Sequence, residues 1–307
     1  MSAKTAITIG NFDGVHRGHA ALVRAARACV GATGRVVVVT FDPHPIAILR
    51  PDQAPLRLTT PDERERRLIL AGADEVVPLR TTQELLQRSA EAFIVSMVEA
   101  FEPQFIVEGP DFHFGHRRAG SVDTLRELGT RYGFGVQVID PVEASLQDQT
   151  IVNVSSSMVR WMLTHGRVAD AARLLDAPFT HVGPVVQGDQ RGRTIGFPTA
   201  NIDTHGVMLP ADGIYAGLAE RPDGTRYIAA ISVGTKPTFG AAPRTCEAYL
   251  VDYNGPVDDY GWVIRLEFHR WVRAQVKYDG VEPLMAQLHR DIDSCRTLMQ
   301  QELQSTA

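Results

Sequence analysis

The chain has 307 residues, of which 44% are hydrophobic and 22% are charged, and its formal net charge is −5 at pH 7. This composition is typical of a globular protein, and the acidic excess argues against general binding to nucleic acids or membrane surfaces. The N-terminus lacks a signal-peptide pattern and no apolar run reaches membrane-spanning length. We therefore expect a cytoplasmic protein, and its length predicts two domains. The three cysteines, Cys29, Cys246 and Cys295, lack metal-ligand spacing and are expected to be reduced thiols.

The first half of the chain alternates between strand and helix patterns. Apolar, strand-like runs occur at residues 5–9, 36–41, 75–79, 104–107 and 135–139. Helical patterns separate these runs at residues 20–29, 61–71, 90–101 and 122–132. Apolar strands separated by helices predict a parallel sheet covered on both faces. In such a sheet the ligand crevice lies beyond the carboxyl ends of the strands.

The first motif directly follows the first strand. Residues 10–19 read Gly-Asn-Phe-Asp-Gly-Val-His-Arg-Gly-His and open the first helical run. A helix N-terminus favours an anion, and the three glycines leave room for a phosphate to approach the backbone. His16 and His19 flank the last glycine, and the segment supplies no nucleophile. The motif therefore predicts electrostatic stabilisation of a phosphorus centre during direct transfer; the alternative is a surface turn that carries two histidines.

Three other segments are expected at the same sheet edge. Thr-Phe-Asp-Pro-His-Pro at residues 40–45 follows the second strand, and Gly-Pro-Asp-Phe-His-Phe-Gly at residues 109–115 follows the fourth. Val-Ser-Ser-Ser-Met-Val-Arg at residues 154–160 leads into short helical runs at 156–165 and 168–175. Each segment alone can be a turn or a helix cap, but the arginine of the third can also bind a phosphate through paired hydrogen bonds. Together they predict one site at this edge.

From about residue 179 the pattern changes to closely spaced strands without intervening helices. These strand-like runs lie at residues 182–186, 200–202, 214–219, 227–233, 246–252 and 262–272. They predict an antiparallel barrel. Residues 281–303 predict a final helix that packs against the barrel through an apolar stripe, which consists of Leu284, Leu288, Ile292, Cys295, Leu298 and Met299.

The second half carries its own motif. Residues 188–201 read Gly-Asp-Gln-Arg-Gly-Arg-Thr-Ile-Gly-Phe-Pro-Thr-Ala-Asn. Regularly spaced glycines with arginines between them can wrap a phosphate, although a hairpin is the alternative. Thr199 and Asn201 offer the hard oxygen ligands that suit Mg²⁺. Glu247 lies within an apolar strand, where it is either an exposed strand position or a general base for a hydroxyl nucleophile.

The order and spacing of these motifs resemble the bacterial bifunctional riboflavin kinase/FMN adenylyltransferases, also called FAD synthetases, over nearly the whole chain. Residues 233–239 and Arg273 match this family as well. The resemblance implies an α/β Rossmann-like nucleotidyltransferase domain at residues 1–178. It implies a small six-stranded riboflavin-kinase barrel with a C-terminal helix at residues 179–307. It further implies that the barrel converts riboflavin and MgATP to FMN and ADP, and that the first domain converts FMN and a second ATP to FAD and diphosphate.

The resemblance also assigns roles to single residues. It implies that His16 and His19 stabilise the transition state at the α-phosphate, that Glu247 is the base of the kinase reaction and that Arg273 gates its flavin site. The implied ATP contacts of the first domain are Gly10, Asn11, Phe12, Asp13, Gly18, Ser155, Ser156 and Arg160. Its implied flavin contacts are Asp42, His44, Asp111 and Phe112. The implied ATP contacts of the barrel are Gly188, Gly192, Gly196, Thr199 and Asn201, and the last two also bind Mg²⁺.

One segment departs from the family pattern. The usual run is close to Ile-Ser-Ser-Thr-Arg-Ile-Arg, whereas Ser157 and Met158 stand here in place of the threonine and the first arginine. Two rival functions remain. A single adenylyltransferase for another phosphate-bearing substrate leaves residues 188–201 and Glu247 unexplained. A flavin-binding regulator with a decayed transferase half is supported only by Met158. The sequence does not indicate an oligomeric state.

Overall fold

We describe a computed structural model of the chain, which covers residues 4–204, 206–235, 244–256 and 258–306. Residues 236–239 of the family-matching segment lie outside these described residues. The chain forms two compact units. The first unit comprises Met1–Leu56, Pro61–Ala144 and Val152–Ser155, and the second comprises Arg57–Thr60, Ser145–Ile151 and Ser156–Ala307.

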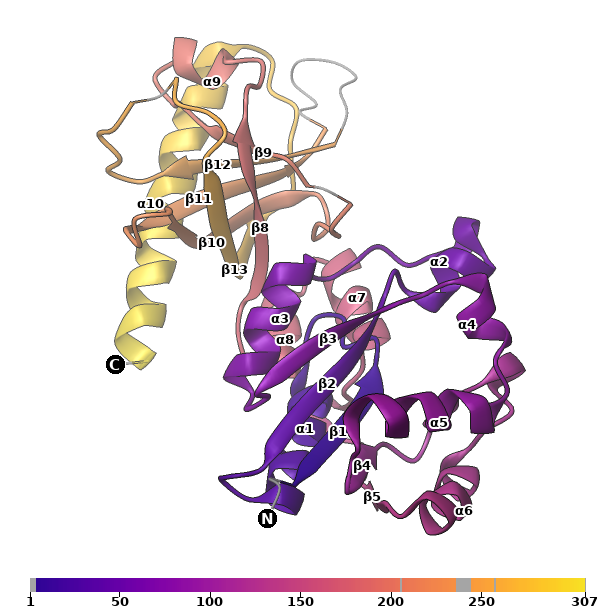
Figure 1. Cartoon of the computed structure of the whole chain (residues 1–307). Helices are drawn as coiled ribbons and strands as arrows, with labels where there is room; N and C mark the ends of the chain where they lie inside the picture. The colour runs from indigo at the N-terminus through magenta and orange to yellow at the C-terminus, as the bar shows by residue number, and fades with distance from the viewer. Residues whose placement is uncertain (1–3, 205, 236–243, 257, 307) are drawn as a thin grey trace. The chain divides into compact units, whose positions relative to one another are not determined.

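The first unit is built on a parallel sheet of five strands in the order β3-β2-β1-β4-β5 (Figure 1). The strands are β1 Thr5–Gly10, β2 Arg35–Asp42, β3 Glu75–Arg80, β4 Phe105–Glu108 and β5 Gly135–Val138. In the inner strand β2, which lies between β3 and β1, residues Val36 to Val39 are all completely buried, as expected for a strand that is covered on both faces. The parallel sheet that the sequence predicts is confirmed.

Helices cover both faces of this sheet. On one face, α1 (Arg17–Val30) and α3 (Pro61–Leu70) contribute Val23 and Leu68 to the core. On the other face, α5 (Ala90–Phe101) and α6 (Val122–Tyr132) contribute Phe93 and Leu125. Several short elements were not predicted, namely α2 Pro45–Leu49, η1 Pro51–Gln53, α4 Gln83–Gln87, η2 His116–Arg118 and the paired strands β6 Glu143–Ser145 and β7 Ile151–Asn153.

The second unit contains a closed antiparallel barrel in the strand order β10-β11-β12-β9-β8-β13. The strands are β8 Phe179–Val186, β9 Ala200–Ile202, β10 Gly213–Glu220, β11 Arg226–Gly234, β12 Thr245–Leu250 and β13 Val263–Arg273. Aromatic rings fill part of its interior, since the ring of Phe268 lies 5.5 Å from that of Tyr215 and 5.8 Å from that of Phe179. The six-stranded barrel is therefore confirmed.

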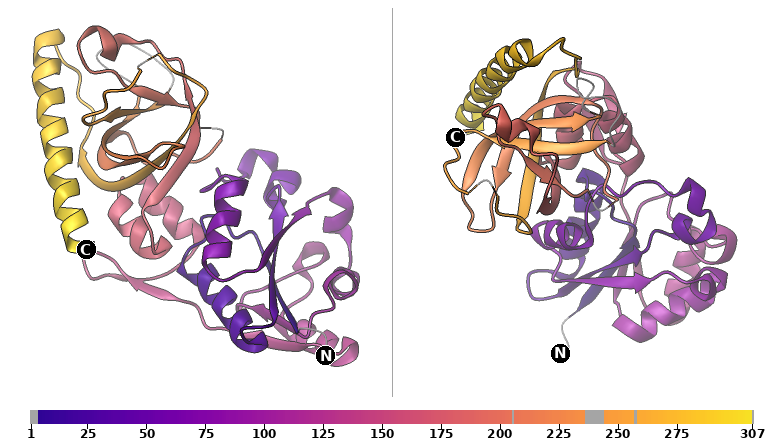
Figure 2. Two further views of the ribbon diagram at one scale, coloured as in Figure 1. Left: turned by 60° about the vertical axis from the view of Figure 1, so that its left-hand side comes forward. Right: turned by 90° about the horizontal axis from the view of Figure 1, so that it is seen from above.

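Helix α10 (Val281–Thr306) runs along the outside of the barrel (Figure 2). Its predicted apolar stripe has two roles. Cys295 and Met299 are completely buried and pack against Ala216 and Leu218 of β10. The N-terminal part of the stripe, Leu284, Leu288 and Ile292, lines a cavity instead.

The remaining helices belong to the second unit. Helices α7 (Ser156–Thr164) and α8 (Val168–Leu175) group with the barrel by their contacts, whereas the boundary expected from the sequence, between residues 178 and 179, assigns them to the first domain. The segment at residues 188–201, expected to be a loop, contains the short helix α9 (Arg191–Thr194).

Candidate active sites

The first candidate site is the turn between β1 and α1. His16 is the N-cap of α1, and its Nδ1 accepts the backbone N–H of His19 at 3.3 Å. Because Nδ1 accepts, the proton of a neutral His16 ring is on Nε2. The two imidazoles stack with their centroids 3.6 Å apart. Gly18 makes this arrangement possible, because a Cβ at this position would come within 3.1 Å of the His16 ring.

Two polar atoms of this turn are buried without a protein partner. Burial lowers the pKa of His19 well below its usual value, and the nearby His16 lowers it further. The Nδ1 of His19 and the Oδ1 of Asn11 have no hydrogen-bond partner among the described residues. Since buried polar atoms are nearly always paired, a ligand with hydrogen-bonding groups would complete this turn.

The turn is held by contacts with neighbouring elements. The carbonyl oxygen of Asn11 accepts from Thr40 Oγ1 at 3.2 Å and from Arg64 Nη1 at 3.3 Å. Asp13 is buried. Phe12 is only 1% exposed and packs in the core, with its ring 5.0 Å from that of His19. A Cβ at Gly10 would come within 3.2 Å of the Phe12 ring, so this glycine allows the backbone to pass over it.

The flavin contacts expected in the first unit follow the ends of β2 and β4. The Asp42 carboxylate ends β2 and lies 3.9 Å from Arg64 Nη2. His44 caps α2, since its Nδ1 accepts the Ile46 N–H at 3.1 Å. After β4, Asp111 is exposed and the half-buried Phe112 stacks on Phe114 with ring centroids 5.2 Å apart.

The serine-rich segment is divided between the two units. Ser155 ends the first unit, while Ser156 and Arg160 belong to α7 in the second. Within the first unit, the carbonyl oxygen of Val154 would lie 3.7 Å from a Cβ at Gly18, so the chain enters this segment beside the histidine turn.

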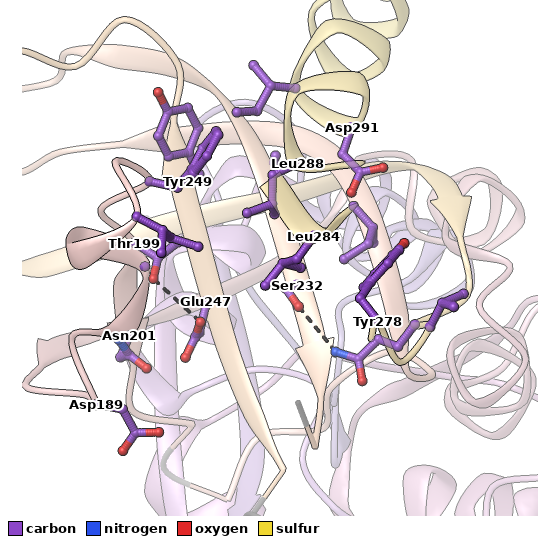
Figure 3. A pocket seen from close by; sticks show the side chains of 18 of the residues that line it. Asp189, Thr199, Asn201, Ser232, Glu247, Tyr249, Tyr278, Leu284, Leu288 and Asp291 are labelled. Carbon is purple, nitrogen blue, oxygen red and sulfur yellow. Dashed lines mark hydrogen bonds between the residues drawn. The ribbon is translucent and has the colours of Figure 1, made fainter. Parts of the chain in front are cut away.

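The second candidate site is a cavity of about 170 Å³ in the second unit, bounded by the barrel and α10 (Figure 3). It collects many of the residues singled out in the sequence, namely Gly192, Thr199, Asn201, Glu247 and Arg273. Gly188 and Gly196 do not line it. These glycines have other roles: a Cβ at Gly188 would come within 2.3 Å of the Asn201 amide, and Gly196 has a left-handed φ of +85°.

Glu247 lies on the cavity wall. In the barrel it is paired with Asn201 of β9 and Ser232 of β11. Its neighbours in β12, Cys246 and Ala248, are completely buried, whereas Glu247 is half-buried and lines the cavity. The Thr199 hydroxyl donates to Glu247 Oε2 at 3.4 Å (Figure 3).

The donor set at this wall consists of hydroxyl, amide and carboxylate oxygens, from Thr199, Asn201 and Glu247. Oxygen donors of this kind fit Mg²⁺, which usually takes one or two carboxylates together with substrate phosphates. No group of three or more His, Cys, Asp or Glu side chains within the described part of the chain could hold a metal ion by itself.

Asp291 of α10 is a cavity residue that was not predicted from the sequence. Arg273 donates to the Asp291 carboxylate from Nε at 2.8 Å and from Nη2 at 2.6 Å, and Gln287 donates to it at 2.9 Å. The hydrogen bonds and charge of Asp291 raise the pKa of Arg273. Asp291 is only 3% exposed. It follows Leu288 by three residues, so the sequence already places this carboxylate on the apolar face of the predicted helix, which could have identified it as a candidate functional residue.

Aromatic and apolar side chains form much of the remaining wall. The ring of Phe197 lies 6.0 Å from Tyr249 and 4.9 Å from His289. Tyr278 and the α10 residues Leu284 and Leu288 lie across from Glu247 (Figure 3). The cavity therefore has a polar side with oxygen donors and a side that is rich in aromatic and apolar groups.

Comparison with known proteins assigns a family to each half of the chain. Residues 1–157 match the family model of FAD synthetase, and residues 175–299 match that of riboflavin kinase. The chain is 35% identical to the bifunctional riboflavin kinase/FMN adenylyltransferase of Escherichia coli K12 over 295 residues, which cover 93% of this chain and 90% of that protein. It is 31% identical to the corresponding protein of Listeria monocytogenes over 294 residues, which cover 94% of this chain and 91% of that protein.

A solved structure resembles the whole chain as well. The crystal structure of a protein named as a macrolide-efflux protein, from Streptococcus pneumoniae, has a TM-score of 0.82 and 30% identity, and the match covers 96% of this chain and 95% of that chain. In the described ranges of our chain, every helix is too short or too polar to cross a bilayer. The two family models occur in the same order as the two folds, and the relatives match nearly the full length. The chain belongs to the family of bifunctional riboflavin kinase/FMN adenylyltransferases.

Proposed function

We propose that this chain makes FAD from riboflavin in two steps. The barrel transfers the γ-phosphoryl group of ATP to riboflavin and releases FMN and ADP. The first unit then transfers AMP from a second ATP to FMN and releases FAD and diphosphate. The observation that carries this proposal is the presence of two separate sites of fitting chemistry in one chain: stacked imidazoles at a helix N-terminus, and a carboxylate among oxygen donors in a ring-sized cavity.

In the kinase step, we assign Glu247 as the general base. It accepts the proton of the riboflavin 5′-hydroxyl while that oxygen attacks the γ-phosphorus and the bond to the ADP oxygen breaks. The hydrogen bond from Thr199 orients the carboxylate. Thr199 and Asn201 would hold Mg²⁺, which neutralises phosphate charge when bound. We further propose that the loop containing Gly188, Gly192 and Gly196 covers ATP, and that Arg273, held by Asp291, gates the flavin side.

In the adenylyltransferase step, a phosphate oxygen of FMN attacks the α-phosphorus of ATP and diphosphate leaves, so the chain needs to supply no nucleophile. His16 donates through Nε2, and with His19 it stabilises the charge that develops on the α-phosphate. The N-terminus of α1 supports the phosphates. The other proposed ATP contacts are Gly10, Asn11, Phe12 through its backbone, Asp13, Gly18, Ser155, Ser156 and Arg160. The proposed flavin contacts are Asp42, His44, Asp111 and Phe112.

The domain boundary and the cellular location belong to the same proposal. We place the boundary between residues 178 and 179, because α8 ends at Leu175 and the first barrel strand begins at Phe179. We expect the protein to act in the cytoplasm, where thiols stay reduced, since all three cysteines are free.

Incubation of the purified protein with riboflavin, ATP and Mg²⁺, followed by chromatographic separation of the flavins, tests the proposal. We expect FMN to form first and FAD to follow, and removal of Mg²⁺ by a chelator to stop both steps. Accumulation of FMN without FAD at ample ATP would contradict the second step. A single adenylyltransferase would leave riboflavin unconsumed, and a flavin-binding regulator would release no diphosphate.

A further inference from the structure

A buried carboxyl group lies where β4 separates from β1. β1 pairs with β4 only at Ala6–Phe105 and Ile7–Ile106. β4 stays paired with β5 as far as Glu108–Val138, and the Ile139 N–H then donates to the Glu108 carbonyl at 3.0 Å. β4 therefore leaves β1 at the carboxyl edge of the sheet. In the strand order β3-β2-β1-β4-β5, this separation is the crevice where ligands of such sheets bind.

The side chain of Glu108 replaces the missing backbone pairing. Its Oε1 accepts the backbone N–H of Ile9 at 2.7 Å, and the residue is only 2% exposed. Ile9 directly precedes Gly10 and Asn11, which open the histidine turn. A side chain of β4 thus holds the backbone at the point where it enters the proposed ATP site.

Burial and one backbone hydrogen bond act on the ionisation of this carboxyl group. Burial raises the pKa of Glu108 well above its usual value, and the Ile9 N–H, which lowers it, does not compensate. The titratable groups of the adjoining turn are Asp13, His16 and His19, and Arg64 of α3 donates to the Asn11 carbonyl oxygen in the same turn. The neutral acid is therefore favoured to a pH well above the range of an ordinary glutamic acid.

We propose that Glu108 is a positioning residue of the adenylyltransferase step, and that its buried carboxyl group bridges β4 to Ile9 and so holds the Ile9–Asn11 backbone in place for the phosphates of ATP. This inference rests on the proposed function of the first unit. A carboxylate at this edge would repel the triphosphate and would be poorly solvated. An aliphatic side chain would leave the buried Ile9 N–H without an acceptor.

The pH dependence of two matched variants tests the proposal in the full-length protein. Glu108→Gln keeps an acceptor for Ile9 and cannot ionise, whereas Glu108→Met removes the acceptor at similar volume. We expect the KM for ATP in FMN adenylylation to rise with pH in the wild type and to stay flat in Glu108→Gln. Glu108→Met should lower kcat/KM for this step by about 10- to 100-fold at every pH. The kinase reaction of the same molecules is the control and should be unchanged.

Two further measurements do not depend on activity. The infrared band of a protonated carboxyl group should be present in the wild type near neutral pH and missing in Glu108→Gln. Hydrogen exchange at the Ile9 amide should be faster in Glu108→Met and unchanged in Glu108→Gln. If the wild type makes no FAD, the proposed function fails, while these two measurements still decide whether Glu108 is neutral and holds Ile9.

Three results would overturn the inference. The first is an identical pH profile of FMN adenylylation in the wild type and Glu108→Gln. The second is the absence of a wild-type carboxyl band that Glu108→Gln removes. The third is a folded Glu108→Met variant with unchanged exchange at Ile9. Should Glu108→Met fail to fold, the comparison of the wild type with Glu108→Gln decides alone.

Discussion

The ion pair between Arg273 and Asp291 joins β13 to α10 at the cavity, and a second pair on the same helix provides a matched control. In the first pair, the aspartate side chain is 4% exposed and the arginine side chain 21%. In the second, Arg296 of α10 donates to Asp252 at 2.8 and 3.0 Å, and these side chains are 41% and 70% exposed. Both pairs consist of an arginine that donates two hydrogen bonds to an aspartate, so they differ mainly in burial.

The expected cost of Asp291→Asn follows from this burial. The substitution keeps the shape of the side chain, removes its charge and turns an amide N–H₂ group toward the donors of Arg273 or Gln287. Loss of one partner of a fully buried ion pair costs about 3–5 kcal/mol. Because the arginine keeps partial contact with water, we expect the substitution to lower the free energy of unfolding of the second unit by about 2–3 kcal/mol. Arg296→Gln removes an exposed pair and should cost little.

Urea unfolding of the full-length protein, followed by tryptophan fluorescence, measures this difference. All three tryptophans, Trp161, Trp262 and Trp271, lie in the second unit, so the signal reports that unit. Asp291→Asn should also raise the KM for riboflavin, because Arg273 loses its anchor at the cavity wall, and should leave the conversion of FMN to FAD unchanged. Equal shifts of the unfolding midpoint in both variants, or an unchanged KM for riboflavin, would refute the reasoning.

Three further predictions concern the two sites. Glu247→Gln should lower riboflavin phosphorylation by about 10²- to 10⁴-fold while supplied FMN still becomes FAD, as measured by flavin chromatography; normal kinase activity would make Glu247 an ordinary strand position. Since the folded-state pKa of His19 lies below its usual 6.5, the first unit should lose stability as the pH falls below about 6.5. Hydrogen exchange of that unit measures this loss, which should be smaller in His19→Gln. An unchanged pH dependence in this variant would contradict the burial of a neutral His19. Arg160→Ala should impair FAD formation strongly, whereas Met158→Arg should lower the KM for ATP without a matching gain in kcat. Titration of ATP at saturating FMN measures both effects. Normal FMN adenylylation by Arg160→Ala would show that this segment is only a helix cap.

The long elements of the fold could be predicted because each carries a strong period and clear ends. α5 and α6 have the predicted bounds, and Ser89 and Ser121 cap them by accepting the N–H groups of Ala92 and Thr124. α2, α4 and α9 are four or five residues long, which is too short for a 3.6-residue period to repeat. His44 and Thr82 cap α2 and α4 through their side chains, whereas α9 has no side-chain cap.

The identity of several candidate site residues could be predicted from the sequence, but their arrangement in space could not. Chemistry-bearing residues such as Glu247 and Thr199 could be found, because carboxylate and hydroxyl groups in a patterned strand or beside a glycine-rich loop stand out. They meet because β12 pairs with β9, and this strand order is not specified by local pattern. The glycines were expected to wrap a phosphate, yet a Cβ at Gly192 would also come within 2.3 Å of the Phe197 carbonyl oxygen. Close backbone packing alone thus accounts for part of the glycine spacing.

Glu108 shows why the electrostatics of a site cannot be derived from local sequence. The fourth strand was expected to end at residue 107. β4 instead retains Glu108, and the carboxyl group turns back to Ile9, which is 99 residues away in the chain. Its ionisation is therefore set by the separation of two strands and by its burial there. The first unit holds His19 and Glu108 in environments that disfavour charge, whereas the second unit balances the charge of Arg273 with Asp291. The two steps of one pathway should therefore respond differently to pH, even though a single chain carries both.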